Sequence, residues 1–443
     1  MKFRTMLFSA VVAVVGLSAT LGFGQYYNNN NDSVGGVSID ANGLVTNAKT
    51  SDTEQFIQMR QKSMQPVAAE LQKESATRKI SLKAIDAIIA DCKANNKPIP
   101  DSVAFMGGLT KIEFVFAYPE KNDIVLVGPG EAWKIGANGA PVGVKTGAPI
   151  MLLEDFATAI QTCAKAQRGT FSCSIDPTPE GMKNLRVYTS RLVPNMNPQT
   201  AARNIEKAMG NQSVRVMGVD PASHFARVMV SSDYQMKQIS MGTRAASVKG
   251  LPPFTKMVAG GASGASNSLP RWWLAPNYGA VLRDEAGLSW QLQGGSVKTM
   301  CETDFYAENG QIQRGTVKVA PGYQKWADTM TARYEELSKA EPVFGQLRNC
   351  MDSAVVAALI VKENLLSKVE NKFNAITELD SFEFAAPKEV PAMAAVNKAR
   401  KVTIVCGGVD INPWQIVSNT EVKAELNQAA KDVQISEGSF FAN

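Results

Sequence analysis

The sequence has few of the residues from which metal and nucleophilic sites are built. It contains one histidine, His224, and none of its six cysteines form a C-x-x-C pair. Zinc sites need cysteine and histidine ligands at such short spacings, so the sequence does not support a zinc site. It also has no G-x-S-x-G motif and no lysine at the Walker position of a glycine-rich loop. We therefore expect neither a metal nor a cofactor.

Strong charge of one sign and long apolar runs are also absent beyond the N-terminus. The formal net charge is +5, and no dense stripe of lysine and arginine alternates with aromatic residues, so we expect no nucleic acid partner. The longest later apolar run, at residues 354–361, is too short to span a bilayer and is typical of the middle of a buried helix. The mature chain is therefore expected to have no transmembrane segment.

The N-terminus has the three parts of a secretory signal peptide. Two basic residues open the chain, an apolar stretch spans residues 6–21, and Gly22-Phe23-Gly24 places small residues where a signal peptidase cuts. We expect cleavage after Gly24, with an uncleaved membrane anchor as the alternative. Gln25 would then be the first residue, so a lipid-modified cysteine is not expected there. This pattern predicts export to the periplasm, the cell surface or the extracellular space.

The six cysteines have different sequence contexts. Cys92, Cys350 and Cys406 continue the apolar faces of helical or strand patterns, which indicates core packing. Cys163 and Cys173 are the best candidate pair, because one closes a helical pattern and the other lies on the next strand across a short loop. We expect either a disulfide between these two, worth about 2–4 kcal/mol, or two free thiols.

Length and composition predict an α+β protein with more than one domain. About 420 residues would remain after cleavage, which is enough for two or three domains with ample cores. Residues 25–34 are a polar, low-complexity lead that we expect to be disordered. Residues 251–270, rich in proline, glycine and serine, are the expected linker or mobile loop. The mature chain would then consist of an N-terminal α+β domain at 35–250 and a C-terminal α+β domain at 271–443.

Hydrophobic patterns predict antiparallel sheets with tandem strand–turn–strand–helix units, followed by long helices near the C-terminus. An alternative is that the two units resemble each other only as any two hairpins do. Long helices are expected at 324–339 and 342–369. The two units would comprise strands at 112–118, 123–127, 214–219 and 226–230 and helices at 152–163 and 234–241.

Two local signals are more specific than these patterns. Asn42-Gly43 lies between strand-like runs and suits the positive φ angles of a tight hairpin turn. Ser81 precedes a helical pattern at 82–94 and is a suitable N-cap. We therefore expect a hairpin at the first position and a helix that begins at Leu82.

Several patches of the chain also resemble one known family. They are Gly35-Gly36-Val37-Ser38-Ile39-Asp40, His224-Phe225-Ala226, Asp233-Tyr234-Gln235-Met236-Lys237 with Met241-Gly242, Arg271-Trp272-Trp273, Pro342-Val343-Phe344-Gly345-Gln346-Leu347-Arg348 and Gly407-Gly408-Val409-Asp410. Together they resemble a domain-of-unknown-function family of exported proteins that is expanded in planctomycete-type bacteria, over most of the mature chain. The resemblance implies a bacterial protein of the periplasm or cell surface. It implies no activity, and Thr243-Arg244 and the cysteines depart from the family pattern.

Candidate catalytic residues form no complete motif. His224 follows a turn, and without a nucleophile elbow or a third orienting group we expect it at a turn or strand edge. Asp233 and Lys237 have the helical i,i+4 spacing of a surface ion pair. Four acidic residues could supply the paired carboxylates of a glycoside hydrolase, or else be solvated charges beside hairpins: Asp284, Glu285, Glu302 and Asp304.

One constellation points to binding, and it is an aromatic cluster beside the expected linker. It consists of Arg271, Trp272, Trp273, Tyr278 and Trp290. These side chains could pack at a domain boundary or form a platform for a glycan or a peptide. Because neighbouring residues of a strand point to opposite faces, at most one of the two adjacent tryptophans lines any given surface.

The sequence therefore predicts an exported protein with a binding, scaffold or surface-assembly role in the cell envelope. Its partner would be a glycan, a peptide or an envelope protein. The alternative is a hydrolase that cleaves an envelope or extracellular polymer through paired carboxylates. Two carboxyl groups that converge in a cleft with raised pKa values would favour the hydrolase, whereas an open aromatic face without them would favour binding.

Mass spectrometry of protein purified from its native cells tests the predicted cleavage. We expect the N-terminal peptide to begin at Gln25 and the protein to be recovered outside the cytosolic fraction, because signal peptidases cut after small residues. Intact Met1 on protein from the cytosolic fraction would contradict this expectation.

Overall fold

The computed structural model describes residues 34–166, 168–191, 196–257, 268–307, 309, 311–315, 319–380, 384–396, 402–431, 433, 435–436 and 438–443. The expected signal peptide and most of the expected lead lie outside these residues. Val34, the last residue of the segment expected to be disordered, is buried and forms a β-bridge with Val37. None of the helices in the described part has the length and hydropathy needed to cross a membrane.

The protein belongs to the α+β class, as expected. Two seven-stranded sheets, here called sheet I and sheet II, are formed by the described residues. In spatial order, sheet I consists of β14 (Ile312–Gln313), β13 (Gly294–Tyr306), β10 (Ser268–Tyr278), β18 (Cys406–Ile411), β8 (Phe171–Asp176), β9 (Asn211–Met217) and β15 (Glu389–Pro391). Sheet II consists of β19 (Thr420–Val422), β11 (Val281–Arg283), β12 (Ser289–Gln291), β4 (Phe114–Tyr118), β5 (Asp123–Gly130), β3 (Ser75–Ser81) and β20 (Phe441–Ala442).

Strands from both sides of residues 251–270 pair within each sheet. In sheet I, β18 pairs with β10 on one side and with β8 on the other, and in sheet II β12 pairs with β4. One continuous hydrophobic core extends in sequence from Val34 to Phe440. The expected division into domains at 35–250 and 271–443 therefore does not correspond to separate folding units. Residues 258–267 of the expected linker lie outside the described residues. Proline and glycine content carries no information about which strands pair across such a segment.

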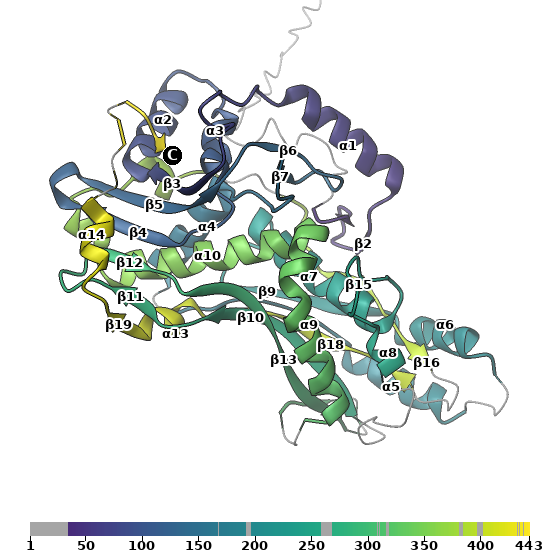
Figure 1. Cartoon of the computed structure of the whole chain (residues 1–443). Helices are drawn as coiled ribbons and strands as arrows, with labels where there is room; N and C mark the ends of the chain where they lie inside the picture. The colour runs from purple at the N-terminus through teal and green to yellow at the C-terminus, as the bar shows by residue number, and fades with distance from the viewer. Residues whose placement is uncertain are drawn as a thin grey trace, which may run out of the picture.

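The helix α10 (Pro342–Lys362) lies between the two sheets, as Figure 1 shows. Every residue from Val343 to Ile360 is buried. It packs against α4 (Leu153–Lys165), α7 (His224–Met241) and α9 (Pro321–Ala340). The expected long helix at 342–369 is divided, because Asn364 has a positive φ of 54° and the short α11 (Leu365–Lys368) follows it.

The segment 226–230, expected to be a strand, belongs to helix α7. The Ser223 side chain accepts a hydrogen bond from the Ala226 amide and caps the helix. All residues of α7 are buried, so its sequence lacks the amphipathic period that distinguishes a helix from a strand. The first expected unit is present as β4, β5 and α4. Of the second, the strand at 214–219 corresponds to β9 and the helix at 234–241 belongs to α7, but the strand between them is absent, because β9 leads directly into α7.

Local sequence signals predict two other elements correctly. β1 (Val37–Ile39) and β2 (Val45–Asn47) form the hairpin predicted from Asn42-Gly43, and Gly43 has a φ of +88°. Helix α2 (Leu82–Ala94) begins after Ser81, whose side chain accepts a hydrogen bond from the Ala84 amide. Other helices of the described residues are α1 (Thr50–Ser63), α5 (Pro179–Thr189), α6 (Pro198–Met209) and α8 (Phe254–Met257).

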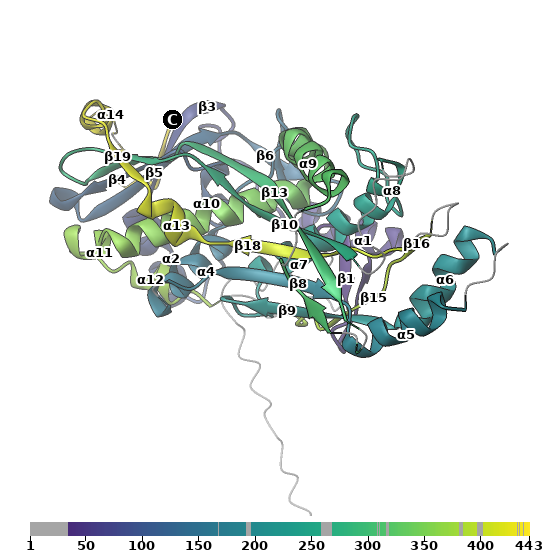
Figure 2. The ribbon, with the colours of Figure 1, turned by 90° about the horizontal axis from the view of Figure 1, so that it is seen from below.

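The two faces of sheet I have different surroundings. Helices α7 and α9 pack on one face, here called the inner face. On the outer face, α5 and α6 pack against Leu269 and Cys406 at one end of the sheet. The rest of the outer face is more open, with Met217 63% and Met300 37% exposed (Figure 2). The candidate site lies in this open part.

The expected disulfide between Cys163 and Cys173 is not formed. The Cys163 Sγ atom lies 4.0 Å from the carbonyl oxygen of Ala354 in α10. Cys173 is on the inner face of sheet I, near Asp233 and Lys237 of α7. The two thiols therefore face different parts of the core, and burial raises the pKa of the Cys163 thiol to about 12.

A cut in the connection between the two halves tests the single core. We expect a chain cleaved at a protease site inserted at residues 258–267 to elute as one particle and to unfold in one cooperative transition, because both sheets contain strands from both fragments. The uncut protein with the same insertion is the control in size-exclusion chromatography and urea unfolding. Two fragments that separate and remain folded would contradict the single core.

Candidate binding groove

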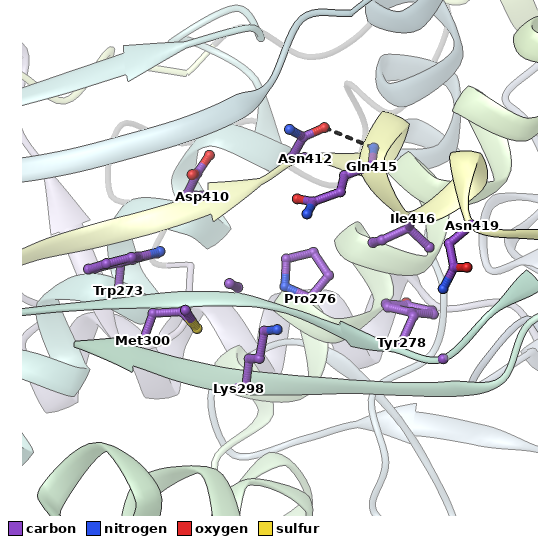
Figure 3. Close-up of a pocket in the computed structure, with 12 residues that line it drawn as sticks. Trp273, Pro276, Tyr278, Lys298, Met300, Asp410, Asn412, Gln415, Ile416 and Asn419 are labelled. Atoms are coloured by element: carbon purple, nitrogen blue, oxygen red, sulfur yellow. Dashed lines mark hydrogen bonds between the residues drawn. The ribbon is translucent and has the colours of Figure 1, made fainter. Parts of the chain in front are cut away.

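A groove lies at the junction of the two sheets, where α13 (Pro413–Ser418) interrupts a parallel strand pairing. β10 pairs with β18 along Arg271–Leu274, and β11 pairs with β19 along Val281–Arg283. Between these two ladders the chain leaves β18, forms α13 and then enters β19 (Figure 2). The resulting gap beside β10 is a cavity of about 580 Å³ (Figure 3).

One wall of the groove comes from the antiparallel pair β10 and β13 and is mainly apolar. Trp273 lies directly opposite Met300 in this ladder, and Ala275 lies opposite Lys298. Strand alternation therefore places these four side chains on one face. The residues of this wall are Trp273, Ala275, Pro276, Tyr278, Gly279, Lys298 and Met300.

The other wall comes from the end of β18 and from α13 and is mainly polar. It consists of Asp410, Asn412, Gln415, Ile416 and Asn419. The Asn412 Oδ1 atom accepts a hydrogen bond of 3.1 Å from the Gln415 amide and so caps α13. Among the described residues, the side chains of Asp410, Gln415 and Asn419 have no hydrogen-bond partner. Partial burial raises the pKa of the Asp410 carboxyl group.

Trp273 is the aromatic residue of the cluster that is free to bind a ligand. Its ring packs on no other aromatic ring and its indole nitrogen makes no hydrogen bond within the described structure. Trp272, by contrast, is fully buried, with its ring centroid 4.3 Å from that of Trp326, and its Nε1 donates to the Tyr323 carbonyl oxygen. The prediction that the two adjacent tryptophans face opposite sides is confirmed.

The structure separates the other members of the predicted aromatic cluster. Arg271 is 6% exposed and forms ion pairs with Asp304 at 2.6 Å and with Asp176 at 2.8 Å. Trp290 is buried in sheet II, where the Lys368 Nζ atom lies 5.7 Å from its ring centroid. Of the five predicted residues, Trp273 and Tyr278 line the groove.

Tyr278 connects the groove to the buried helix α10. Its hydroxyl group donates a hydrogen bond to Oδ1 of Asp352, while Oδ2 of Asp352 accepts one of 3.2 Å from the Ile112 amide. Burial raises the pKa of Asp352 to about 6, and the hydrogen bond from Tyr278 partly opposes this shift. The tyrosine ring is thus fixed from behind the groove.

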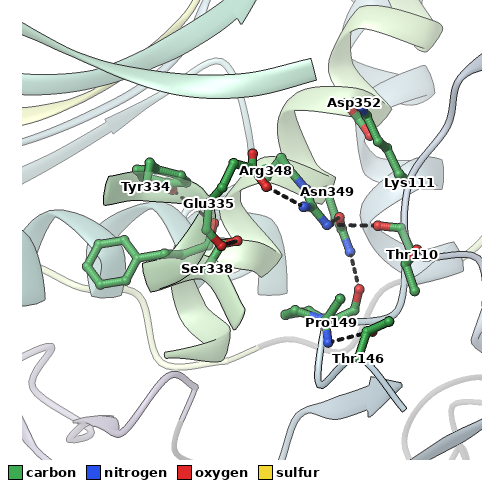
Figure 4. A network of polar contacts seen from close by, with 12 residues as sticks. Thr110, Lys111, Thr146, Pro149, Tyr334, Glu335, Ser338, Arg348, Asn349 and Asp352 are labelled. Carbon is green, nitrogen blue, oxygen red and sulfur yellow. Dashed lines mark hydrogen bonds and ion pairs between the residues drawn. The ribbon is translucent and has the colours of Figure 1, made fainter. Parts of the chain in front are cut away.

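Two neighbours of Asp352 on α10 anchor the same helix to loops near sheet II. Arg348 donates a hydrogen bond of 2.9 Å to the Thr110 carbonyl oxygen, and Asn349 donates one of 2.9 Å to the Pro149 carbonyl oxygen (Figure 4). Figure 4 also shows Lys111 next to Asp352. These contacts satisfy polar groups on a helix that is otherwise surrounded by apolar side chains.

The residues considered for catalysis lie away from the groove. His224 is the first residue of α7 and is buried, with Nδ1 3.0 Å from the Asp155 carboxylate, so the expected turn or strand-edge position is wrong. Burial lowers the pKa of His224, but the charges of Asp155 and Glu154 outweigh this effect and raise it overall. Asp233 and Lys237 form an ion pair of 2.9 Å that is fully buried rather than exposed.

Lys237 also donates a hydrogen bond of 2.7 Å to the Ile175 carbonyl oxygen. The pair of Asp233 and Lys237 therefore ties α7 to β8, and its role is structural. The surface pair expected from sequence is wrong because α7 packs on the inner face of sheet I and leaves no side in contact with solvent.

The acidic residues considered for hydrolysis do not form a pair in the groove. Asp304 is fully buried in its ion pair with Arg271, and Asp284 Oδ1 accepts a hydrogen bond of 2.8 Å from the Leu288 amide. Glu285 and Glu302 are not among the residues that line the cavity. Asp410 is the one carboxylate in its lining as far as the chain is described.

Neither the α13 wall nor the position of Lys298 in the groove was predicted from the sequence. Asn412-Pro413 was a usable signal, because asparagine caps helices and proline favours their first position. It places a helix start directly after β18 and thus predicts that the strand ends there. Nothing in the sequence indicates that the end of β18 lies beside β10.

Residues 173–254 match the family described as Protein of unknown function (DUF1598). No curated protein and no solved structure matches the chain. The matched segment contains most of β8, the pair α5 and α6, then β9 and α7, and it ends at the start of α8. It therefore covers part of sheet I and its packing, whereas all residues of the groove lie outside it.

Asp352→Asn tests the buried carboxyl group behind the groove. A folded-state pKa of about 6 lies above the ordinary value near 4, so folding takes up a proton between these pH values, and the free energy of unfolding falls as pH rises through them. We expect the substitution to remove roughly 2–3 kcal/mol of that fall, measured by urea unfolding at about pH 4 and about pH 7. Glu285→Gln, at an exposed position, is the control. A pH dependence equal to that of the wild type would contradict the assignment.

Proposed function

We propose that the protein is an exported binding protein of the cell envelope and that the groove beside Trp273 holds its ligand. One observation carries this proposal: an aromatic ring and several polar side chains face one cavity, and within the described residues they have no partners of their own. The proposed export rests on the signal-peptide pattern and on the resemblance described above.

Free polar groups and a free indole in one cavity are typical of a ligand site. Binding pockets have volumes of roughly 300–1,000 Å³ and combine apolar walls with a few polar groups that orient the ligand. This cavity has that size, and it combines one mainly apolar wall with one mainly polar wall. A ligand that stacks on Trp273 would also supply hydrogen-bond partners to Gln415 and Asn419.

The backbone of the apolar wall and the Tyr278 side chain are held in place, which favours binding. Trp273 and Met300 belong to one long antiparallel ladder, and Tyr278 is fixed by Asp352. Side chains that are ordered before the ligand arrives lose less conformational entropy on binding. This wall of the groove is therefore preorganised for binding.

The same geometry disfavours the hydrolase. Glycoside hydrolysis requires two carboxyl groups on opposite sides of the scissile bond, about 5–9.5 Å apart. Asp410 alone supplies a carboxylate to the described lining of the groove. An aromatic platform with a single carboxylate supports binding.

Trp273→Ala tests the groove as the ligand site. We expect the mature protein to bind members of a glycan and peptide array prepared from the cell envelope, and the variant to bind them at least about tenfold more weakly, because tryptophans at the centre of an interface often dominate its energy. Met217→Ala removes an exposed apolar side chain outside the groove and is the matched control. Binding that survives Trp273→Ala unchanged would refute the proposal.

A further inference from the structure

Two side chains of opposite charge lie on opposite walls of the groove. Figure 3 shows Asp410 on the strand that leads to α13 and Lys298 on β13, with the cavity between them. Neither residue belongs to an ion pair within the described part of the chain. Each charge is therefore available to a ligand.

The Trp273 ring lies on the same face as Asp410. Trp273 is opposite Gly408 in the ladder of β10 and β18, and Asp410 lies two residues further along β18. Gly408 has no side chain, and a Cβ atom there would lie 2.0 Å from the Cys173 carbonyl oxygen, so the position requires glycine. No side chain of β18 therefore stands between the ring and the carboxylate.

An aromatic face next to a carboxylate is a favourable site for an ammonium group. The ring attracts a cation through its quadrupole and the carboxylate attracts it through its charge. Lys298, opposite Ala275 on the far strand, disfavours a cation there and attracts an anion. The groove therefore has a negative end at Asp410 and a positive end at Lys298.

A neutral ligand would bury both charges without neutralising either, which costs free energy. Strand addition is also impeded, because Pro276, in the part of β10 that faces the groove, has no amide hydrogen to donate. A ligand that fits must therefore be held mainly by its own charged ends and by contact with the Trp273 ring.

We infer that the ligand is a short zwitterionic peptide, whose ammonium group lies between Trp273 and Asp410 and whose carboxylate lies at Lys298. This inference rests on the proposed function, since it names the ligand class for the same groove. It assigns Asp410 and Lys298 as the residues that determine specificity.

Trialanine in four forms provides the test: with both ends free, N-acetylated, C-amidated, or with both ends blocked. Binding is followed by NMR through the indole signals of the six tryptophans, and the signal of Trp273 is identified by its loss in Trp273→Phe. We expect the free form to shift this signal and to bind at least about tenfold more tightly than the doubly blocked form, with a preference that weakens as salt is added.

Single substitutions assign each charge to its end of the peptide. In Asp410→Asn, the free and N-acetylated forms should bind equally, while the preference for a free carboxylate remains. In Lys298→Met, the free and C-amidated forms should bind equally, while the preference for a free amine remains. A general loss of structure would weaken the binding of all four forms together. Loss of one preference with retention of the other therefore reports the assigned role of each side chain.

Two results would overturn the inference. The first is binding of the doubly blocked form as tightly as the free form, which would leave the groove as a binding site of different specificity. The second is the absence of any shift of the Trp273 signal with all four forms. If the array ligands still require Trp273 in that case, the proposed function stands and only the ligand class is wrong.

Discussion

The structure depends on a helix that is buried on all sides and yet carries polar residues. Helix α10 separates the two sheets, and its apolar side chains belong to the main hydrophobic core. Arg348, Asn349 and Asp352 are buried residues of this helix, and an unpaired polar group in such a position costs roughly 1–3 kcal/mol. Their hydrogen-bond partners come from the loops at Thr110 and Pro149 and from strand β10. The hydrogen bonds of this one helix therefore fix the positions of the two sheets relative to each other.

The groove follows from that placement. β10 belongs to sheet I and continues toward β11 of sheet II, and Asp352 holds Tyr278 at the end of β10. On the other side, β18 and β19 repeat this path in parallel, but α13 separates them. Because α13 cannot continue the ladder, the pairing stops between Leu274 and Val281, and the cavity lies in this interval. Trp273 lies near the end of the paired stretch of β10 and faces this cavity.

Sequence patterns predicted elements whose causes are local. Ser81 caps α2, Asn42-Gly43 forms its hairpin, and alternation along β10 places Trp272 in the core and Trp273 in the groove. The α+β class also followed from these patterns. Long-range pairing did not, because hydrophobic periodicity says which face of a strand is buried but not which strand lies beside it. For the same reason the linker at 251–270 suggested two domains. In α7, which is buried all round, the patterns predicted the helix at 234–241 but a strand at 226–230.

Hydrogen–deuterium exchange of the mature protein, with and without a solubilised fraction of its native cell envelope, tests the central claim most directly. It requires no assumption about the ligand. If the groove is the binding surface, amides of Trp273–Gly279 and Asp410–Asn419 should become protected on addition of the fraction, while the exposed face around Met217 should not change. Protection confined to other regions, or none at any concentration of the fraction, would contradict the account.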